Sequence, residues 1–327
     1  MKVYNIAIIG VGNFGSRHLQ ALKKLQINVN IEVVGKSAQS IKSAQVRYDE
    51  LPNNHCINQI KYHNKIESLS NNLDIVIVST NSDVRKNIVK QLVYTKKIRY
   101  FILEKVAFTS NNDFKEILKL LKTNQIKAWV NCPHRTLEHH KHIKSLLKKE
   151  SNIVFTFEGN SWGLACNSIH YLDLISFLTD DEINSLDNKL LDDTIHKSKR
   201  KGFIEFTGTL LGYTKKGHRF KLTSHLNNTM TNNILTIDTS TKIYTIDESQ
   251  NRINIYSKTD NSNTKLSCVA AHQSDLSHHF IHDIIESGCC SLSSLEESYS
   301  FHKPMLETFH DHLNKTTGIN HSSCPIT

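Results

Sequence analysis

The feature that most constrains the fold is a glycine turn near the start of the chain. The segment "IAIIGVGNFGSRHLQAL" places Gly10, Gly12 and Gly15 directly after an apolar, strand-like run and at the start of a helix. In this context Gly10 allows a tight turn, Gly12 lets a pyrophosphate approach the backbone, and Gly15 allows close packing of helix on strand. N–H groups at Asn13 and Phe14 would then face the phosphates. An ordinary glycine-rich turn is the alternative, but the context favours dinucleotide binding.

The first 130 residues alternate between strand-like and helix-like segments. Apolar runs typical of buried parallel strands occur at residues 4–9, 29–34, 74–78, 100–103 and 127–130. Helical patterns fall between them at residues 16–25, 83–93 and 112–121. This alternation predicts an α/β protein that begins with a Rossmann domain, a doubly wound parallel sheet over residues 1–128.

The pattern changes in residues 129–327. Several short runs alternate apolar and polar residues, as in an antiparallel sheet with one solvated face; strands are expected at residues 153–158, 202–211, 218–222, 233–237, 242–246 and 252–256. Helices are expected at residues 138–148, 167–178, 275–285 and 295–313. These segments predict a second, α+β domain with a largely antiparallel, open sheet.

The charge balance limits the class of partner. The net charge is +9, from 40 Lys and Arg against 31 Asp and Glu, but the basic residues are spread along the whole chain. The short basic clusters do not interleave with aromatics in a recognisable nucleic-acid module. We therefore expect no nucleic-acid partner, and either a solvated basic surface or attraction of anionic small molecules.

Cysteine and histidine usage argues against cross-links and metals. The seven cysteines are odd in number and lack C-x-x-C spacing, so reduced thiols are expected. The strings "HHKH" at 139–142 and "HHFIH" at 278–282 invite a metal hypothesis. Adjacent histidines on a helix point in different directions, however, and no carboxylate or cysteine recurs at ligand spacing, so no metal is expected. No apolar run approaches the length of a membrane span, which predicts a cytoplasmic protein without a membrane partner.

The choice of cofactor depends on the end of the second strand, which reads "VVGKSAQS". An NAD site usually offers an acidic residue to the ribose hydroxyls at this point. Glu32 is within range but lies inside the strand, whereas Lys36, Ser37 and Ser40 could contact a 2′-phosphate. The pattern favours NADP and leaves NAD open.

Four motifs in register resemble a known family. The glycine turn with His18, followed by "VIVSTNSDVR", "LEKV" and "NSIHYLD", is similar in order and spacing to the Gfo/Idh/MocA oxidoreductases, the glucose–fructose oxidoreductase and inositol dehydrogenase group. The resemblance covers at least residues 3–180, and the strand-rich remainder fits the family's second domain. That domain commonly serves for dimerisation in the family, which implies a homodimer or homotetramer through the C-terminal sheet.

The resemblance gives "LEKV" a role in catalysis. In the family an E-K-P turn ends the fifth strand beside the nicotinamide, so Glu104 and Lys105 take the first two positions, and Lys105 would touch both the cofactor ribose and the reacting hydroxyl. A partly desolvated lysine can exchange the hydroxyl proton during hydride transfer. Val106 replaces the family's Pro, and because a cis bond without proline costs about 2.5–4 kcal/mol, a differently shaped turn is expected.

The segment "SIHYLD" supplies a second pair of candidates. His170 and Asp173 stand at i and i+3 on one face of a largely apolar helix. The family carries the same H-x-x-D pair in its active site, which implies that His170 is a general acid or base. Asp173 would support it, orient it or contact a sugar hydroxyl, and a buried core histidine is the alternative.

Other positions follow the family less closely. The family's T-P-x-x-x-H segment, whose backbone passes the riboses, is preceded here by Ser79 and begins with Thr80 and Asn81; Arg85 stands in place of the family's His. Where relatives often have a sugar-binding Asp four residues before the active-site His, this chain has Cys166 with Asn167 beside it. The segment "NCPHR" supplies Arg135, which could hold a carboxylate or phosphate or lie on the surface.

These features predict an NAD(P)-dependent oxidoreductase. The reaction would transfer a hydride between the nicotinamide and a hydroxyl or keto group of a sugar or sugar derivative, with a nucleotide-linked or acidic sugar favoured by the basic balance. A dinucleotide-binding sensor or assembly subunit without catalysis is one alternative. A lyase or hydrolase that recycles tightly bound NAD is another.

Overall fold

The computed structural model describes residues 2–226, 232–269 and 272–327. The chain divides into two compact units, each assembled from separate segments. Unit 1 comprises Met1–Phe108, Asn112–Cys132 and Ala271–Ser298; unit 2 comprises Thr109–Asn111, Pro133–Ala270 and Tyr299–Thr327. The sequence predicts a single division between residues 128 and 129, whereas the structure returns the segment after residue 270 to unit 1.

A six-stranded parallel sheet forms the centre of unit 1. Its strands lie in the order β3-β2-β1-β4-β5-β6, with every neighbouring pair parallel. They are β1 (Tyr4–Ile9), β2 (Val29–Val34), β3 (Ile57–His63), β4 (Asn72–Val78), β5 (Lys97–Leu103) and β6 (Lys127–Val130). The order reverses between β1 and β4, which is where a doubly wound sheet places its ligand.

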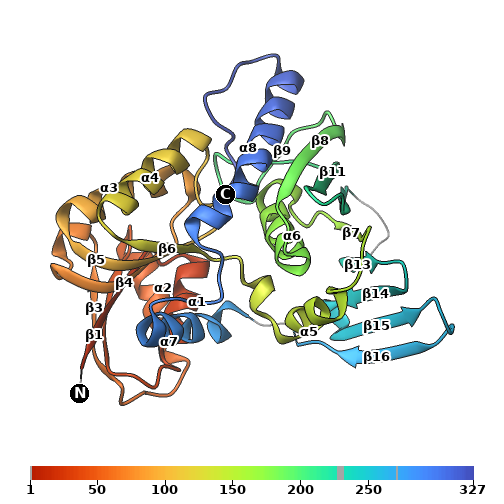
Figure 1. Cartoon of the computed structure of the whole chain (residues 1–327). Helices are drawn as coiled ribbons and strands as arrows, with labels where there is room; N and C mark the ends of the chain where they lie inside the picture. Colours follow the sequence, from red (N-terminus) through yellow and green to blue (C-terminus); the bar gives the residue numbers. More distant parts are fainter. Residues whose placement is uncertain (1, 227–231, 270–271) are drawn as a thin grey trace. The chain divides into compact units, whose positions relative to one another are not determined.

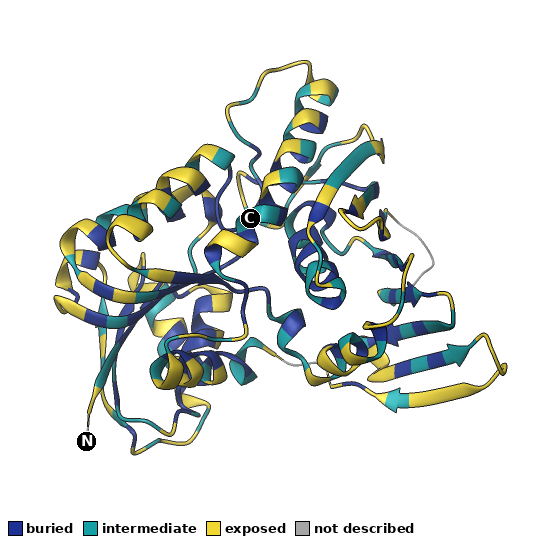
Figure 2. Ribbon diagram, in the orientation of Figure 1, coloured by how far each residue is buried: buried dark blue, intermediate teal, exposed yellow. Residues whose placement is uncertain are grey.

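Helices cover both faces of this sheet. Figure 1 shows α3 (Ser82–Thr95) and α4 (Asn111–Thr123) on one face, with α1 (Asn13–Leu22), α2 (Ala38–Asp49) and α7 (Ser277–Ser287) on the other. Short 3-10 turns occur at η1 (Ile66–Ser68) and η4 (Gln273–Asp275). The last four residues of β1 and of β4 are all buried, as their continuous apolar runs predict (Figure 2).

Unit 2 is built on an eight-stranded sheet in the order β16-β15-β14-β13-β7-β12-β11-β8. Only the β12–β7 pair is parallel among its described strands; the others are antiparallel. The strands are β7 (Val154–Asn160), β8 (Ile183–Leu191), β11 (Gly208–Thr214), β12 (Arg219–His225), β13 (Ile234–Asp238), β14 (Lys242–Asp247), β15 (Arg252–Ser257) and β16 (Asn263–Ser267). The predicted α+β class with a largely antiparallel sheet is confirmed.

The helices of unit 2 carry most of its candidate residues. They are η2 (Pro133–Thr136), α5 (Glu138–Leu147), α6 (Leu164–Thr179) and η3 (Glu248–Gln250), with α8 (Leu295–Thr317) passing from unit 1 into unit 2. A two-stranded sheet joins β9 (His196–Lys197) to β10 (Ile204–Glu205). Among all described residues, no helix is both long and apolar enough to cross a membrane.

Candidate active site

The glycine turn has the geometry that dinucleotide binding requires. Gly10 has φ +88°, which favours glycine, and a methyl group on Gly15 would lie only 1.9 Å from the Gly10 carbonyl oxygen. In contrast, a methyl group on Gly12 would meet no atom within 4 Å. The backbone at Gly12 therefore borders open space at the start of α1, where a phosphate can approach the helix N-terminus.

The turn after β4 lies against the same glycines. Ser79 Oγ donates a hydrogen bond to the Gly10 carbonyl, and the Ser79 backbone N–H donates to the Ile9 carbonyl at 2.9 Å. Thr80 Oγ1 is buried and has no hydrogen-bond partner among the described residues. Asn81 is exposed at the start of α3. A cofactor hydroxyl would satisfy the Thr80 oxygen, so the residues present fit a bound dinucleotide.

The end of β2 helps to decide which dinucleotide fits. Glu32 is buried, and its carboxylate accepts hydrogen bonds from His63 Nε2 at 3.1 Å and from the Ser70 backbone N–H. It is therefore engaged inside unit 1 and does not stand at the strand end as a ribose ligand. Lys36 is exposed just beyond the strand, and Ser37 caps α2 through a 3.2 Å bond from the Ser40 N–H. A contact from Lys36 to a 2′-phosphate stays a prediction.

Glu104 ends β5 within a buried hydrogen-bond network. Its Oε1 accepts from Asn131 Nδ2 at 2.6 Å and lies 2.7 Å from His18 Nε2. Burial alone would raise the pKa of Glu104, but the hydrogen bond and charge of His18, with Asn131 and Lys105, lower it below its usual value. An ionised Glu104 only accepts, so His18 Nε2 donates to it, and His18 Nδ1 lies 2.7 Å from Ser277 Oγ.

Lys105 follows at the carboxyl end of β5 and is 8% exposed. The Lys105–Val106 peptide bond is cis, so the expected change in turn shape is not observed at this bond. Arg85 is buried in α3, and its Nη1 donates to the carbonyls of Val106 and Ala107, the latter at 2.8 Å. Its Nη2 donates to the Thr80 carbonyl.

The position of Arg85 corrects one prediction. The sequence predicts Arg85 to bind the cofactor, but its guanidinium is 1% exposed and donates to backbone carbonyls of two loops. It therefore joins the turn that carries Lys105 to the turn that carries Thr80. Its contribution to a cofactor site is to hold these loops in place.

In unit 2, Arg135 and Asp173 form a buried ion pair. Arg135 Nε donates to Asp173 Oδ2 at 2.8 Å, and the two side chains are 7% and 0% exposed. The guanidinium also lies over the Phe177 ring, 5.4 Å from its centroid. Arg135 is therefore buried and does not lie on the surface, and its role in holding a carboxylate or phosphate stays a prediction.

His170 lies on α6 with its ring packed against other aromatics. It stacks on His134 of η2 with ring centroids 5.2 Å apart and an interplanar angle of 27°. Cys166 lies one helical turn earlier, with Sγ 3.6 Å from the Gly163 carbonyl oxygen, and Asn167 donates to the Trp162 carbonyl at 2.7 Å. Because Cys166 and His170 are four residues apart, they share one face of α6.

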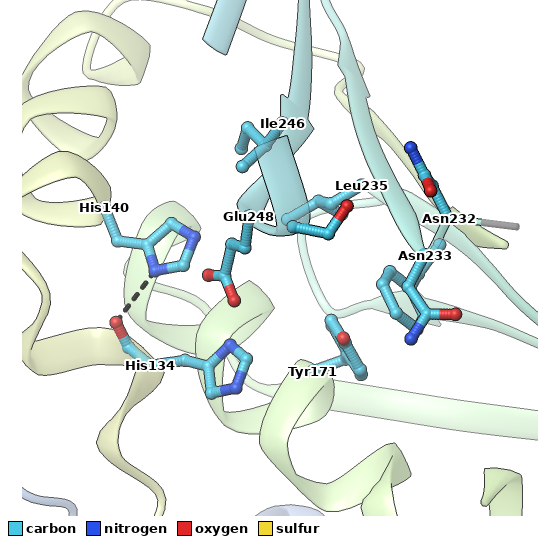
Figure 3. A pocket seen from close by; sticks show the side chains of 10 residues that line it. His134, His140, Tyr171, Asn232, Asn233, Leu235, Ile246 and Glu248 are labelled. Carbon is cyan, nitrogen blue, oxygen red and sulfur yellow. Dashed lines mark hydrogen bonds between the residues drawn. The ribbon is translucent and has the colours of Figure 1, made fainter. Parts of the chain in front are cut away.

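A pocket of about 200 Å³ lies beside this histidine stack in unit 2. Figure 3 shows the Glu248 carboxylate pointing toward the rings of His134 and His140, with Tyr171 at the other side of the pocket. Burial, with the neighbouring His139 and His134, lowers the pKa of His140 to about 3. Burial would raise the pKa of Glu248, but the surrounding histidines lower it to about 2.

The structure thus gathers the predicted residues into two groups. In unit 1 the glycine turn, Ser79, Thr80, Glu104 and Lys105 lie at one edge of the parallel sheet; in unit 2 the predicted residues lie on η2 and α6. The sequence reasoning quoted His18 only as part of a motif and did not single out Asn131, Ser277, His134 or Glu248. These residues come from distant segments, and no local spacing connects them.

Unit 1 is therefore a Rossmann domain whose glycine turn is built for a dinucleotide. Residues 4–132 match the model of the oxidoreductase family with an NAD-binding Rossmann fold, GFO_IDH_MocA. The match covers the Rossmann domain of unit 1, and the cofactor that it supports is NAD or NADP. A comparison with curated protein sequences gives no match.

Solved structures share the fold over almost the whole chain. UDP-N-acetylglucosamine 3-dehydrogenase from Acidithiobacillus ferrooxidans is 11% identical with a TM-score of 0.72, covering 98% of this chain and 99% of that one. An oxidoreductase from Agrobacterium radiobacter in complex with NAD+, L-tartaric acid and magnesium is 17% identical, with a TM-score of 0.66 and coverage of 92% and 94%. Biliverdin reductase from Synechocystis sp. PCC 6803, in complex with biliverdin and NADP+, is 11% identical, with a TM-score of 0.69 and coverage of 91% and 95%.

Proposed function

We propose that this protein is an NAD(P)-dependent dehydrogenase or reductase that acts on a hydroxyl or keto group of a sugar derivative. The observation that carries the proposal is Lys105 at the carboxyl end of β5, next to Glu104 in its buried network. A sensor that only binds a dinucleotide has no evident need for a nearly buried lysine at this position. The proposal therefore favours catalysis over binding alone.

The cofactor would be held by residues of unit 1. The start of α1 and the open space at Gly12 would hold the pyrophosphate, and Lys36 would contact a 2′-phosphate. The bound nicotinamide supplies the hydride donor or acceptor. Glu104, ionised and hydrogen-bonded by His18, places a negative charge near Lys105.

Lys105 and His170 are the proposed proton-handling residues. Oxidation of an alcohol needs a group that takes the hydroxyl proton, and reduction needs one that returns it. The ammonium of Lys105 would also hydrogen-bond the reacting oxygen. Asp173 is paired with Arg135 inside unit 2, so we assign Asp173 a supporting role for α6 and His170.

A sugar derivative is the proposed substrate class. It is supported by the resemblance, by the basic net charge and by the sugar-nucleotide dehydrogenase among the solved structures. Biliverdin reductase shares the same fold, so the fold by itself does not choose the substrate. Cys166 and Asn167, at the start of α6, are the proposed side chains for substrate contact. Association into dimers or tetramers through the C-terminal sheet belongs to the same proposal.

The experiment is a paired titration of cofactor-free protein with NADPH and NADH, followed by nicotinamide fluorescence. We expect NADPH to bind more tightly and Lys36→Ala to remove the difference, while Lys42→Ala, a change on the exposed surface of α2, keeps it. A panel of keto-sugars and nucleotide-linked sugars is then screened for oxidation of the preferred cofactor. Binding of neither cofactor would refute the proposal.

Two results would point to the alternatives. Tight binding without turnover on any member of the panel, in either direction, would favour a sensor or assembly subunit. The second result is a cofactor that stays bound through purification and is neither consumed nor produced while the substrate is cleaved. This result would favour a lyase or hydrolase that recycles NAD.

A further inference from the structure

We propose that His134, His140 and Glu248 form a binding site for one divalent transition-metal ion of the zinc class. One ligand atom from each of these residues lies within 4.8 Å of the others, and all three residues belong to unit 2. They come from η2, α5 and η3, and Figure 3 shows their side chains converging at one side of the pocket. The proposal does not depend on the dehydrogenase assignment.

The strongest argument is the hydrogen bonding of His140. Its Nδ1 lies 2.8 Å from the His134 carbonyl oxygen, which can only accept, so Nδ1 carries the proton and Nε2 carries the lone pair. A metal-binding histidine commonly donates its other N–H to a backbone carbonyl in this way. The contact therefore fixes both the orientation of the ring and the tautomer that a metal needs.

The second argument is that Nε2 of His140 lacks a partner. The residue is 1% exposed, and this nitrogen makes no hydrogen bond to any residue that the structure describes. Leaving a buried acceptor unsatisfied costs about 1–3 kcal/mol. A metal ion bound at Nε2 would satisfy it.

The donor set indicates the class of metal. Two imidazole nitrogens and one carboxylate suit Zn²⁺, Co²⁺ or Fe²⁺, whereas Mg²⁺ and Ca²⁺ prefer oxygen donors. Ligand atoms of a tetrahedral zinc lie roughly 3.3 Å apart, so the donors would need to converge by roughly 1.5 Å at most. Side-chain rotation can supply this, because Glu248 is 35% exposed and follows directly on the end of β14.

The surroundings support an ion with an open coordination position. His139 Nε2 lies 3.5 Å from Glu248 Oε1, which helps to keep the carboxylate near the two rings. The pocket beside the three ligands is also lined by Tyr171 and Asn232 and has room for a water molecule or a ligand oxygen. Three protein ligands with a fourth position open to solvent or substrate are typical of catalytic rather than purely structural zinc sites.

The test uses the full-length, tag-free protein after removal of metals with a chelator. Zn²⁺ is titrated against a chromophoric chelator, and Co²⁺ serves as a spectroscopic probe of tetrahedral coordination. We expect one tightly bound equivalent. Glu248→Gln keeps the shape of the side chain, and His140→Asn keeps a donor toward the His134 carbonyl; each should weaken binding at least about tenfold.

His142→Asn is the matched control. His142 is exposed on the same helix as His140, so its loss should leave the affinity at the wild-type value. Zinc should also raise the melting temperature of the wild type and of His142→Asn, and should raise that of Glu248→Gln less. If wild-type protein binds Zn²⁺ no more tightly than Glu248→Gln and His140→Asn, the ion is held only by exposed histidines and the proposed site is refuted.

Discussion

The buried His140 predicts how the stability of the metal-free protein depends on pH. Its pKa is lowered from 6.5 to about 3 in the folded protein, with burial as the largest cause. Below its ordinary pKa the unfolded chain binds a proton that the folded protein does not bind. The free energy of unfolding must therefore fall as the pH falls from about 6.5 toward 3.

The magnitude follows from the shift. Between about pH 7.5 and about pH 5, the unfolded chain gains nearly a full proton at this site, so His140 alone should remove about 2 kcal/mol from the free energy of unfolding. His140→Asn abolishes this contribution but retains a donor for the His134 carbonyl. The wild type should therefore lose about 2 kcal/mol more than the variant over the same interval.

Urea unfolding followed by circular dichroism, with a chelator present, measures this difference at both pH values. Histidines that do not interact with His140 contribute equally to both proteins, so their contributions cancel. His142→Asn, exposed on the same helix, should follow the wild type. If the gap between the wild type and His140→Asn were the same at both pH values, the neutral, buried state assigned to His140 would be wrong.

Three further predictions concern unit 1. Arg85→Met removes the donors to three loop carbonyls and should lower the free energy of unfolding by about 3 kcal/mol or more, measured by urea denaturation, while Arg85→Lys should lose less. Gly15→Ala places a methyl group against the Gly10 carbonyl and should lower the free energy of unfolding by about 1–3 kcal/mol. Gly12→Ala should leave the melting temperature unchanged but weaken NADPH binding about tenfold, measured by fluorescence. Lys105→Met should abolish turnover in the steady-state assay while cofactor affinity stays within about threefold of wild type; retained activity would contradict its role.

Much of the parallel sheet was predictable because buried strands leave a clear sequence signal. Residues 4–9, 29–34 and 127–130 have the bounds that their apolar runs predict. The edge strand β3 was missed because "INQIKYH" is half polar and no residue of it is fully buried. Helix α2 was missed for a similar reason, since it buries only Ala44 and Tyr48.

In unit 2 the sequence signal was weaker. The run predicted as one strand over residues 202–211 is divided between β10 and β11, and Gly208 has φ +93° at the start of the second. The edge strands β8 and β16 were not anticipated; β16 is mostly exposed and polar, and only the two end residues of β8 are buried. An edge strand pairs with only one neighbouring strand, so its alternation of apolar and polar residues is less strict.

The candidate site residues also differ in how far the sequence predicts them. The glycine turn and "LEKV" are local motifs, and the structure places both at the carboxyl edge of the parallel sheet. The pairing of Arg135 with Asp173 and the convergence of Glu248 on His140 depend on contacts between distant segments. No spacing in the sequence predicts these contacts. The expectation of no metal site was based only on the spacing of nearby histidines, cysteines and carboxylates.

The return of residues 271–298 to unit 1 has a consequence for how this protein can be made and rearranged. Ser277 from that segment hydrogen-bonds His18, and the Ser293 carbonyl accepts from the Val130 N–H at 3.0 Å. During synthesis on the ribosome, the support for Glu104 cannot be completed until Ser277 has emerged. The first 132 residues are therefore not a self-sufficient module, because Ser277, which hydrogen-bonds His18 beside Glu104, belongs to the later segment of unit 1.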